Sequence, residues 1–579
     1  MKKTGRRPFC VLFVMAMLMS ATACGTVKNE EKPQEPEPAK QEADQTPGSE
    51  EKTEIEESSE AEERSESEET QTVVPEEKSA LFNVVKTSMG CQYSESVNDE
   101  WHSVETLQDF FLLEDESAKY YPALAKALED YKNENESTIE TTMGSLMENF
   151  TDVVVNGGLG VDLEDRTTRS VLRADQSYFS FLEQNESYYG GAHGGYMITG
   201  MTFDVNTGVR VTLSDLIRDA DRLKEIVAKQ LDEVYGDIFY EDVYQMIDAY
   251  DLDGFTWSMD ASGITLYFNQ YELAPYVEGM QTIELTSEDY PELLEQSCFE
   301  PQEQYVLELC ANEDYAVDVD NDGVKEKLTV ERSVDEYDYY TTNILLDGQT
   351  VKSDVEDFDA DFHLVKCKDA GYLYIFHRVE NDYSILEVFD LATGSLVPWD
   401  DGNSNLFLSS TYAGHEEDGR YYYETNSPVF LNPELIYLSS RLDTLSTYSG
   451  TKKYHVGESG LPVSDDEVYT VDAGFLLKAK ADVPCKIMQE DGTVTAENGV
   501  IPAGTFFKIV SATETEVWCV QAIDYVPESE EYDLNYFMVN EDTTYDTNTL
   551  YYIQIDREYG DTIDGRDIWE LLDGLMYAG

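Results

Sequence analysis

Apolar and polar positions are distributed unevenly along the chain, and their pattern changes near residue 80. A short apolar run at 9–19 is followed, over about 28–79, by a segment composed almost wholly of Glu, Ser, Thr, Pro, Gln and Lys. Such a segment buries too little apolar surface to offset the entropy of ordering, so we expect a solvated, self-repelling linker. Periodic apolar patterns, and with them the folded part, begin at about residue 80.

The first folded region, 80–297, mixes helix and strand patterns. Leu124, Leu128 and Tyr131 recur at helical spacing, and Ser214 is a suitable N-cap for a second helix. Strands and helices in segregated runs predict an α+β domain. The strand patterns lie at 170–182, 197–205, 209–213, 255–259, 263–268 and 280–285.

From residue 303 onward the pattern predicts β structure. Short apolar runs alternate with turn signals such as Ala392-Thr-Gly394, which favours a β-rich module over 303–460. In the last unit, 461–579, the segment 501–510 resembles the Pro-Ala-Gly-Thr turn and strand of SH3-like bacterial barrels. A short helical pattern at 567–575 ends the chain. The expected fold class is therefore multidomain: an α+β domain followed by β-rich modules, preceded by a signal peptide and a disordered acidic linker.

The N-terminus has the pattern of an export signal. Four basic residues precede the apolar run and four small residues, 20–23, follow it, which predicts a secretory signal peptide over 1–23. Cys24 directly after small residues resembles a bacterial lipobox, although Ala21 stands where that pattern prefers Leu. The resemblance implies a lipidated Cys24 at the head of the linker 24–79. The alternative is ordinary cleavage before an unmodified Cys24.

Composition excludes two classes of partner and says little about disulfides. Lys and Arg number 39 and Asp and Glu 119, so the formal net charge is −80. Nucleic acids and anionic membrane surfaces need a basic face, so neither is an expected partner of the folded part. The cysteines beyond the N-terminal segment are too few for a disulfide framework. Two alternatives remain: the cysteines are buried free thiols, or they form the disulfides Cys298–Cys310 and Cys485–Cys519.

Four motifs in the first region carry a family resemblance. In order they are Tyr188-Tyr-Gly-Gly-Ala-His-Gly-Gly-Tyr196, Phe203-Asp-Val-Asn-Thr-Gly208, Leu213-Ser-Asp-Leu-Ile217 and the segment 263–279. This order resembles the extracytoplasmic domain of the sigma-V anti-sigma factor and the domain that precedes the catalytic part of certain peptidoglycan deacetylases (DUF3298 and DUF4163 type). The resemblance implies that 80–297 is a domain like the one with which the anti-sigma factor binds lysozyme. No sigma-factor role is expected, because the anti-sigma factor's membrane helix and sigma-binding part have no counterpart here.

An acidic loop in the second region has the spacing of a calcium site. Carboxylates at positions 1, 3, 5 and 9 of a loop, with glycine at 6, supply the oxygen ligands that a hard cation requires. A strand follows directly and Thr329 occupies position 12, so the loop resembles integrin-like and VCBS-type β repeats and not an EF-hand. We expect a structural Ca²⁺ site; the alternative is a solvated acidic turn without an ion. The predicted ligands are Asp318, Asp320, Asp322, the carbonyl of Val324, and Glu326.

Histidine and tyrosine gather in the family motifs. His193 suits acid–base chemistry, but no nucleophile motif, HExxH or second nearby His accompanies it, so its glycines favour a structural turn. Tyrosine is a good interface anchor, whereas alternating aromatics in strands can equally form core. The predicted binding residues are Tyr188, Tyr189, His193, Tyr196, Tyr271 and Tyr276.

The function expected from these features is binding without catalysis. The chain would be an exported lipoprotein, anchored through Cys24 to the outer face of the cytoplasmic membrane of a Gram-positive bacterium. It would engage a cationic protein such as lysozyme, which the charge of −80 would steer, or peptidoglycan. Two alternatives stay open: a cell-wall hydrolase or peptidoglycan-modifying enzyme, and an accessory scaffold lipoprotein.

Overall fold

The computed structural model describes residues 81–299, 302–319, 324–379, 383–399, 404–489, 491–525, 537–539, 543–557 and 560–577. The predicted fold class is confirmed, because an α+β region is followed by several β-sheet modules. The predicted signal peptide, Cys24 and the acidic linker lie outside the described residues. Within them, no helix is both long and apolar enough to cross a membrane.

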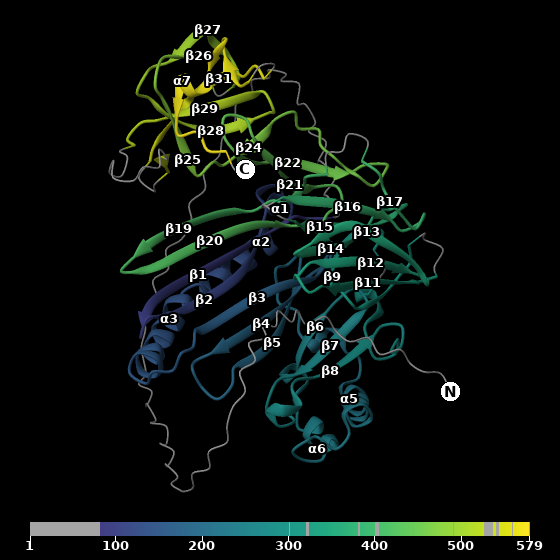
Figure 1. Cartoon of the computed structure of the whole chain (residues 1–579). Helices are drawn as coiled ribbons and strands as arrows, with labels where there is room; N and C mark the ends of the chain where they lie inside the picture. The colour runs from purple at the N-terminus through teal and green to yellow at the C-terminus, as the bar shows by residue number, and fades with distance from the viewer. Residues whose placement is uncertain are drawn as a thin grey trace, which may run out of the picture. The chain divides into compact units, whose positions relative to one another are not determined.

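A seven-stranded sheet organises the N-terminal region (Figure 1). Its order is β19-β20-β1-β2-β3-β4-β5, and only β2 and β3 run parallel. A parallel pair needs a crossover, which three helices and a π-helical turn, η1 (Phe150–Val155), provide. The strands are β1 (Val84–Val97), β2 (Glu100–Leu113), β3 (Leu163–Ala174), β4 (Tyr178–Tyr188) and β5 (Gly195–Asp204), and the helices α1 (Asp115–Tyr120), α2 (Pro122–Asn135) and α3 (Thr138–Asn149).

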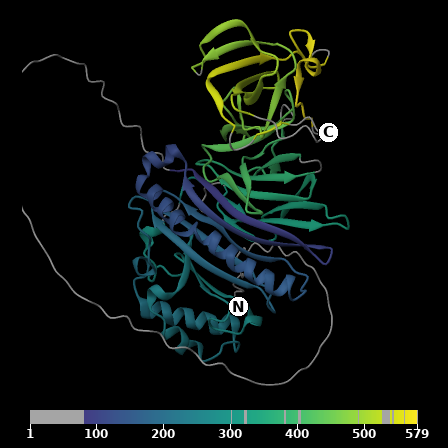
Figure 2. The same cartoon turned by 90° about the vertical axis from the view of Figure 1, so that its left-hand side faces the viewer.

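The helices pack on this sheet with the face that the sequence predicts. Leu124 and Leu128 of α2 are fully buried against Phe179 and Phe181 of β4. Helix α3 buries Met143 against β1 and β2. Figure 2 shows the long helices lying along the strands.

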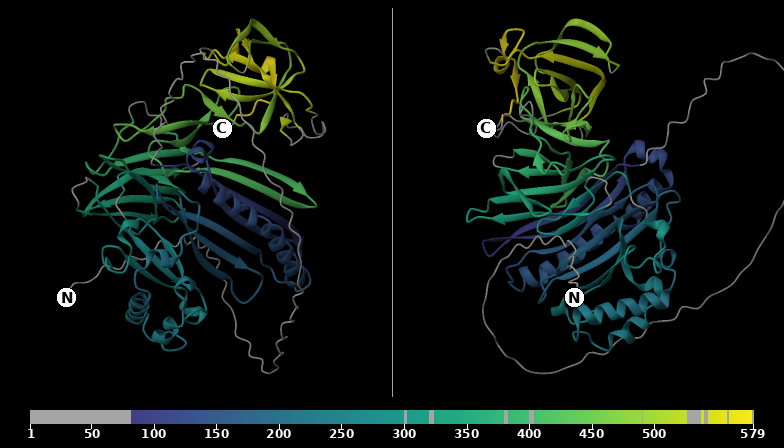
Figure 3. Two further views of the ribbon diagram at one scale, coloured as in Figure 1. Left: turned by 180° about the vertical axis from the view of Figure 1, so that it is seen from behind. Right: turned by 90° about the vertical axis from the view of Figure 1, so that its right-hand side faces the viewer.

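A hairpin from far along the chain completes the same sheet. The strands β19 (Thr411–Glu417) and β20 (Arg420–Val429) continue it beyond β1 (Figure 3). The pairing of β20 with β1 runs from Val84↔Val429 to Gln92↔Tyr421. A Cβ on Gly90 would lie 2.3 Å from the ring of Tyr423, so this close approach requires glycine. Part of the predicted module 303–460 therefore belongs to the N-terminal sheet.

A second layer contains three helices and a three-stranded sheet around one core. The helix expected after Ser214 is broken in two, because Thr212 caps a short first turn and Asp219 caps the longer helix α5 through the amide of Arg222. The expected cap Ser214 instead donates to Asp253. The elements are α4 (Leu213–Leu216), α5 (Ala220–Tyr235), α6 (Val243–Asp248), η2 (Leu252–Gly254), β6 (Thr256–Met259), β7 (Gly263–Phe268), η3 (Tyr276–Glu278), β8 (Gln281–Thr286) and η4 (Gln296–Cys298).

Two antiparallel sheets then form a β-sandwich. Strand β15 (Gly371–Arg378) is buried along nearly its whole length because its second face packs against β21 (Ile436–Leu442) and β22 (Tyr448–Val456). The first sheet is β10 (Asp314–Val317), β11 (Glu326–Val334), β12 (Tyr340–Leu346) and β13 (Gln349–Asp357); the second is β9 (Tyr305–Leu309), β14 (Asp359–Lys366), β15 (Gly371–Arg378), β16 (Ser384–Asp390) and β17 (Ser395–Leu396).

The C-terminal strands belong to one branched, thirteen-stranded sheet with its own core. The sheet begins before residue 460, so the predicted boundary at that point separates hydrogen-bonded strands. Of the helical pattern at 567–575, Ile568–Leu571 forms α7. The strands are β18 (Phe407–Leu408), β21 (Ile436–Leu442), β22 (Tyr448–Val456), β23 (Pro462–Val463), β24 (Tyr469–Val471), β25 (Phe475–Ala479), β26 (Val483–Gln489), β27 (Val494–Ile501), β28 (Phe506–Ala512), β29 (Glu516–Ala522), β30 (Phe537–Met538), β31 (Tyr545–Gln554) and β34 (Leu572–Asp573), with β32 (Thr562–Ile563) and β33 (Arg566–Asp567) in a separate hairpin.

Cysteines in the described residues are mostly buried free thiols. Cys298, Cys485 and Cys519 are all unbridged, so neither pair considered from the sequence forms a disulfide. Burial raises the pKa of the Cys485 thiol to about 11 and raises that of the fully buried Cys519 as well.

Candidate binding surface

The glycine-rich motif forms the turn between β4 and β5. Gly190 has a φ of 82°, and a Cβ there would lie 2.7 Å from a methyl carbon of Val153. A Cβ on Gly194 would lie 2.9 Å from the carbonyl oxygen of Ser187. Side chains at these positions would force the turn apart, so glycine is needed for the chain to reverse here. The turn leaves His193 exposed to solvent.

The motif at 263–279 is fastened to the outer edge of β5. Asn269, directly after β7, accepts a hydrogen bond from the amide of Ile198 at 2.8 Å and donates to the carbonyl of the same residue at 3.0 Å. The backbone amide of Asn269 donates to the carboxylate of Glu272 at 2.7 Å. Tyr271 lies between them with a φ of 69°, an uncommon value for tyrosine. This anchored loop carries its tyrosines to the glycine-rich turn.

Three rings from the two motifs form what we call the aromatic cluster: His193, Tyr271 and Tyr276. The rings of His193 and Tyr276 stack with centroids 3.9 Å apart and an angle of 24°. The Tyr271 hydroxyl lies 3.2 Å from Nε2 of His193, 78 positions away along the chain. The Tyr276 hydroxyl donates to the carbonyl of Gly194 at 3.1 Å. The cluster is therefore ordered by its own contacts, while Tyr271 keeps 55% of its surface exposed.

An open pocket of about 290 Å³ lies beside the aromatic cluster. Amide, hydroxyl and thioether side chains join the three rings, and no carboxylate is among its lining residues. The pocket thus offers stacking surfaces and neutral hydrogen-bonding groups, which suit recognition; it holds no carboxylate pair of the kind that glycoside hydrolysis uses. Besides the cluster and two glycines, the lining residues are Asn185, Ser187, Tyr196, Met197 and Gln270.

Of the other three predicted tyrosines, one lines this pocket and two lie behind the glycine-rich turn. Tyr196 lines it, and its hydroxyl accepts a hydrogen bond from Gln184 at 2.9 Å. Tyr188 donates to the carbonyl of Gly191 at 3.1 Å and so braces the turn. Tyr189 packs on the core under α3 and donates to Asp165 at 2.6 Å. The structure therefore brings His193, Tyr196, Tyr271 and Tyr276 together at the pocket and places Tyr188 and Tyr189 behind the turn.

A row of charged side chains crosses the strands next to Tyr196. Glu186 is the cross-strand neighbour of Tyr196 and of Arg166, and Glu164 lies across from Tyr188. Arg166 forms ion pairs with Glu105 and Glu164. Burial, followed by the charge of Glu164, raises the pKa of Glu186. Three carboxylates against one guanidinium leave this row acidic.

The loop at 318–326, for which the sequence predicts calcium, is only partly described. Asp320, Asp322 and Gly323 lie outside the described residues. The loop joins β10 to β11, and Glu326 at its end accepts a hydrogen bond from the amide of Val319 at 2.9 Å. The carbonyl of Asp318 accepts one from the buried Lys366 at 2.7 Å. No cluster of three or more metal-binding side chains occurs in the part of the chain that the structure covers, so the ion stays a prediction.

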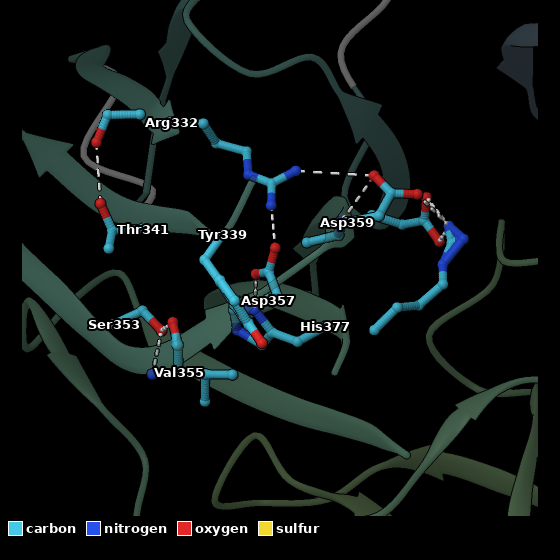
Figure 4. A network of polar contacts seen from close by, with 12 residues as sticks. Arg332, Tyr339, Thr341, Ser353, Val355, Asp357, Asp359 and His377 are labelled. Atoms are coloured by element: carbon cyan, nitrogen blue, oxygen red, sulfur yellow. Dashed lines mark hydrogen bonds and ion pairs between the residues drawn. The ribbon is translucent and has the colours of Figure 1, made fainter. Parts of the chain in front are cut away.

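A buried network of charges, which the sequence does not reveal, links the two sheets of the sandwich (Figure 4). His377 of β15 is fully buried and bonds Asp357 of β13 at 2.6 Å and Glu387 of β16 at 3.1 Å. Arg332 pairs with the second oxygen of Asp357. Ser353 donates to Glu387 at 2.5 Å. Two positive groups thus face two carboxylates away from solvent, which indicates a structural role.

One comparison with known protein families matches a region that includes three of the ten residues lining the pocket, Gln270, Tyr271 and Tyr276. A family model described as "Protein of unknown function (DUF3298)" matches residues 214–288, so the chain contains a DUF3298 domain. Two crystal structures of DUF3298 family proteins are similar to part of the chain. The one from Bacteroides fragilis NCTC 9343 is 16% identical with a TM-score of 0.28 and covers 38% of this chain and 96% of its own. The one from Pseudomonas aeruginosa PAO1 is 13% identical with a TM-score of 0.25 and covers 39% and 99%.

No curated protein matches the chain. The DUF3298 part of the sequence resemblance is confirmed by the family model, which includes Tyr271 and Tyr276. The relation to an anti-sigma factor stays a prediction.

Proposed function

We propose that this protein is a non-catalytic binding module of the bacterial envelope, held at the membrane through Cys24, whose aromatic cluster engages a cationic protein such as lysozyme. One observation carries the proposal. Two motifs selected from the sequence, 78 positions apart at His193 and Tyr271, meet in one exposed, ordered cluster beside a pocket. The meeting places aromatic rings from two distant parts of the chain on one exposed surface, which suits recognition.

The chemistry of the surface suits a positively charged protein partner. Tyrosine combines a rigid apolar ring with a hydroxyl and loses little conformational entropy on binding, which makes it a frequent anchor of interfaces. The acidic row of Glu105, Glu164 and Glu186 against Arg166 lies on neighbouring strands. Together with a net charge of −80, it would speed the encounter with a cationic partner and disfavour acidic ones.

Peptidoglycan is the second candidate, and the neutral pocket favours it. Stacked rings beside the amides of Asn185 and Gln270 are the groups with which proteins hold sugar rings. Such binding would depend little on salt, because the pocket lining carries no carboxylate.

Titration calorimetry of the full chain with hen-type lysozyme tests the main proposal. It is run at about 150 mM and about 500 mM salt, because screening separates contact from long-range attraction. Micromolar binding that survives the higher salt is expected, and Tyr271→Ala together with Tyr276→Ala should weaken it at least tenfold. Tyr244→Ala removes a tyrosine that is 46% exposed on α6, in the same layer but outside the aromatic cluster, and should leave binding unchanged.

Three outcomes separate the hypotheses. Binding that vanishes at the higher salt, or that the double variant Tyr271→Ala with Tyr276→Ala leaves intact, would contradict recognition by the aromatic cluster. Absence of lysozyme binding, with retention of the wild type but not the cluster variant on insoluble peptidoglycan, would favour the second candidate. Membrane anchoring is tested on its own, because Cys24→Ala should move the chain from the membrane fraction to the medium.

A further inference from the structure

The strand β19 forms one edge of the seven-stranded sheet, opposite the edge at β5. It pairs with β20 from Thr411↔Asn426 to Glu417↔Arg420 without a bulge, and no other strand of the described chain pairs with it. All seven of its residues are exposed. In an antiparallel pair every second residue turns its amide and carbonyl away from the partner strand. The outer side of β19 therefore presents a row of backbone donors and acceptors.

This edge is held firmly in place. Its partner β20 pairs with β1 over the whole stretch from Val84 to Gln92. The Tyr423 hydroxyl donates to Glu105 at 2.6 Å, and Thr87 donates to Asn426 at 2.6 Å. An incoming strand would meet a preformed template, so little additional ordering of this chain would oppose its binding.

Aromatic rings flank both faces of the edge. Tyr412, 60% exposed, lies parallel to Tyr423 with centroids 6.4 Å apart and donates to the Tyr421 hydroxyl at 2.8 Å. On the opposite face His415 lies parallel to Tyr422 at 5.5 Å. Alternate side chains of an added strand project to the two faces, so each set would find an aromatic surface.

The charges around the edge select the partner. Glu416, Glu417 and Asp418 gather where β19 turns into β20, and Arg420 is engaged by Glu140 at 3.4 Å. Charged residues on an edge normally prevent pairing with like strands. Here they would repel a second copy of this chain, whose charge is −80, and attract a segment rich in Lys or Arg.

We propose that β19 is a docking edge at which an extended, basic segment of another protein adds as a further strand of the sheet. This surface lies on the sheet edge opposite β5, where the aromatic cluster is attached, and the proposal does not depend on what that cluster binds. Main-chain hydrogen bonds would supply affinity, and the acidic turn with its flanking tyrosines would supply specificity.

The test uses the full chain and a labelled peptide of about eight residues that alternates Lys with Val, so that the lysines share one face of the strand. Fluorescence anisotropy should show saturable binding, and hydrogen exchange should show new protection at 411–417. The same peptide with alternate backbone nitrogens methylated keeps its charge but cannot complete the hydrogen bonds. It should bind at least tenfold more weakly.

Matched charge variants separate docking from general attraction. Glu416→Lys with Glu417→Lys should weaken binding at least tenfold. Asp465→Lys with Glu467→Lys makes the same charge change at exposed positions before β24 and should have little effect. Unchanged exchange at 84–92 verifies that the variants keep the sheet intact. Equal binding of the methylated peptide, equal loss in both double variants, no binding of the parent peptide, or protection elsewhere than 411–417 would each overturn the proposal.

Discussion

Replacing His377 by Gln removes the positive charge from the centre of the buried network. Burial alone would lower the pKa of His377, but the hydrogen bonds to Asp357 and Glu387 outweigh it, and the net shift is upward. Burial likewise opposes ionisation of Glu387, yet the bonds from His377 and Ser353 lower the pKa of that carboxyl overall. The fold therefore stabilises the imidazolium and the carboxylate together.

The directions of the two pKa shifts determine how the stability of the sandwich changes with pH. Because the pKa of His377 is raised, its contribution is fully present below the unfolded value of about 6.5 and is lost as the pH rises through the folded value. Because the pKa of Glu387 is lowered, its contribution is present above about 4.3 and is lost as the pH falls through its folded value. The network should stabilise the sandwich most between these two pH values.

The size of the stability loss expected for His377→Gln follows from the burial of its partners. Asp357 is fully buried and Glu387 only 13% exposed, so without His377 two adjacent carboxylates would face Arg332 alone. Leaving a buried charge without its partner costs on the order of 3–5 kcal/mol. Each unit by which the pKa of His377 is raised corresponds to about 1.4 kcal/mol, or tenfold in the opening equilibrium.

Native-state hydrogen exchange of peptides from β13 and β15, corrected for intrinsic exchange rates, measures the free energy of local opening of these strands. A local measurement is needed because a chain of several modules does not unfold in one two-state transition. The wild-type free energy of opening should fall as the pH rises above about 6.5. His377→Gln should be less protected at pH 6 and lose the slope, whereas His455→Gln on β22 should keep both. Equal protection of His377→Gln and wild type at pH 6, or the same slope in both, would refute the reasoning.

Three further predictions concern other parts of the chain. Gly90→Ala should loosen the β19–β20 hairpin, because its Cβ would overlap the ring of Tyr423; exchange at 411–429 should increase while that of the C-terminal sheet stays constant. The thiol of Cys519, whose pKa is raised by complete burial, should resist alkylation at pH 8 in the native protein and react in denaturant; rapid native labelling would contradict this. Millimolar calcium should raise the melting temperature, and Asp320→Asn with Asp322→Asn should abolish the rise, while an equal response of this variant would exclude the loop as the site.

Local patterns predict the elements of this fold well. Leu124 and Leu128 share one helical face because helix periodicity is a property of neighbouring residues, and both are buried as expected. The sequence pattern does not show the break between α4 and α5, because Thr212 and Asp219 both act as caps and either could begin a helix. The resemblance to DUF3298 proteins was found because several motifs occur in order within one region.

Contacts between segments that are far apart along the chain could not be predicted from the sequence. The tyrosines next to Arg420 predict a strand, but no neighbouring residue indicates that this strand pairs with β1. His377 shows no partner within hydrogen-bonding range along its own strand, and its carboxylates come from β13 and β16. The meeting of His193 with Tyr271 could be anticipated only from the family resemblance, because the loop that carries Tyr271 is held in place by Asn269, which bonds to Ile198 71 positions away.

The pairing of β20 with β1 also sets an order of events during biosynthesis. Thr87 and Asn426, which bond across this pair, are 339 positions apart. When the N-terminal strands have left the ribosome, the outer edge of β1 has no neighbour until more than three hundred further residues have been synthesised. Pairing over such separations is slow, and open strand edges are prone to aggregation in the meantime. Maturation of the first sheet should therefore depend on completion of the later modules, and truncation before residue 411 should produce a chain that needs chaperones or aggregates.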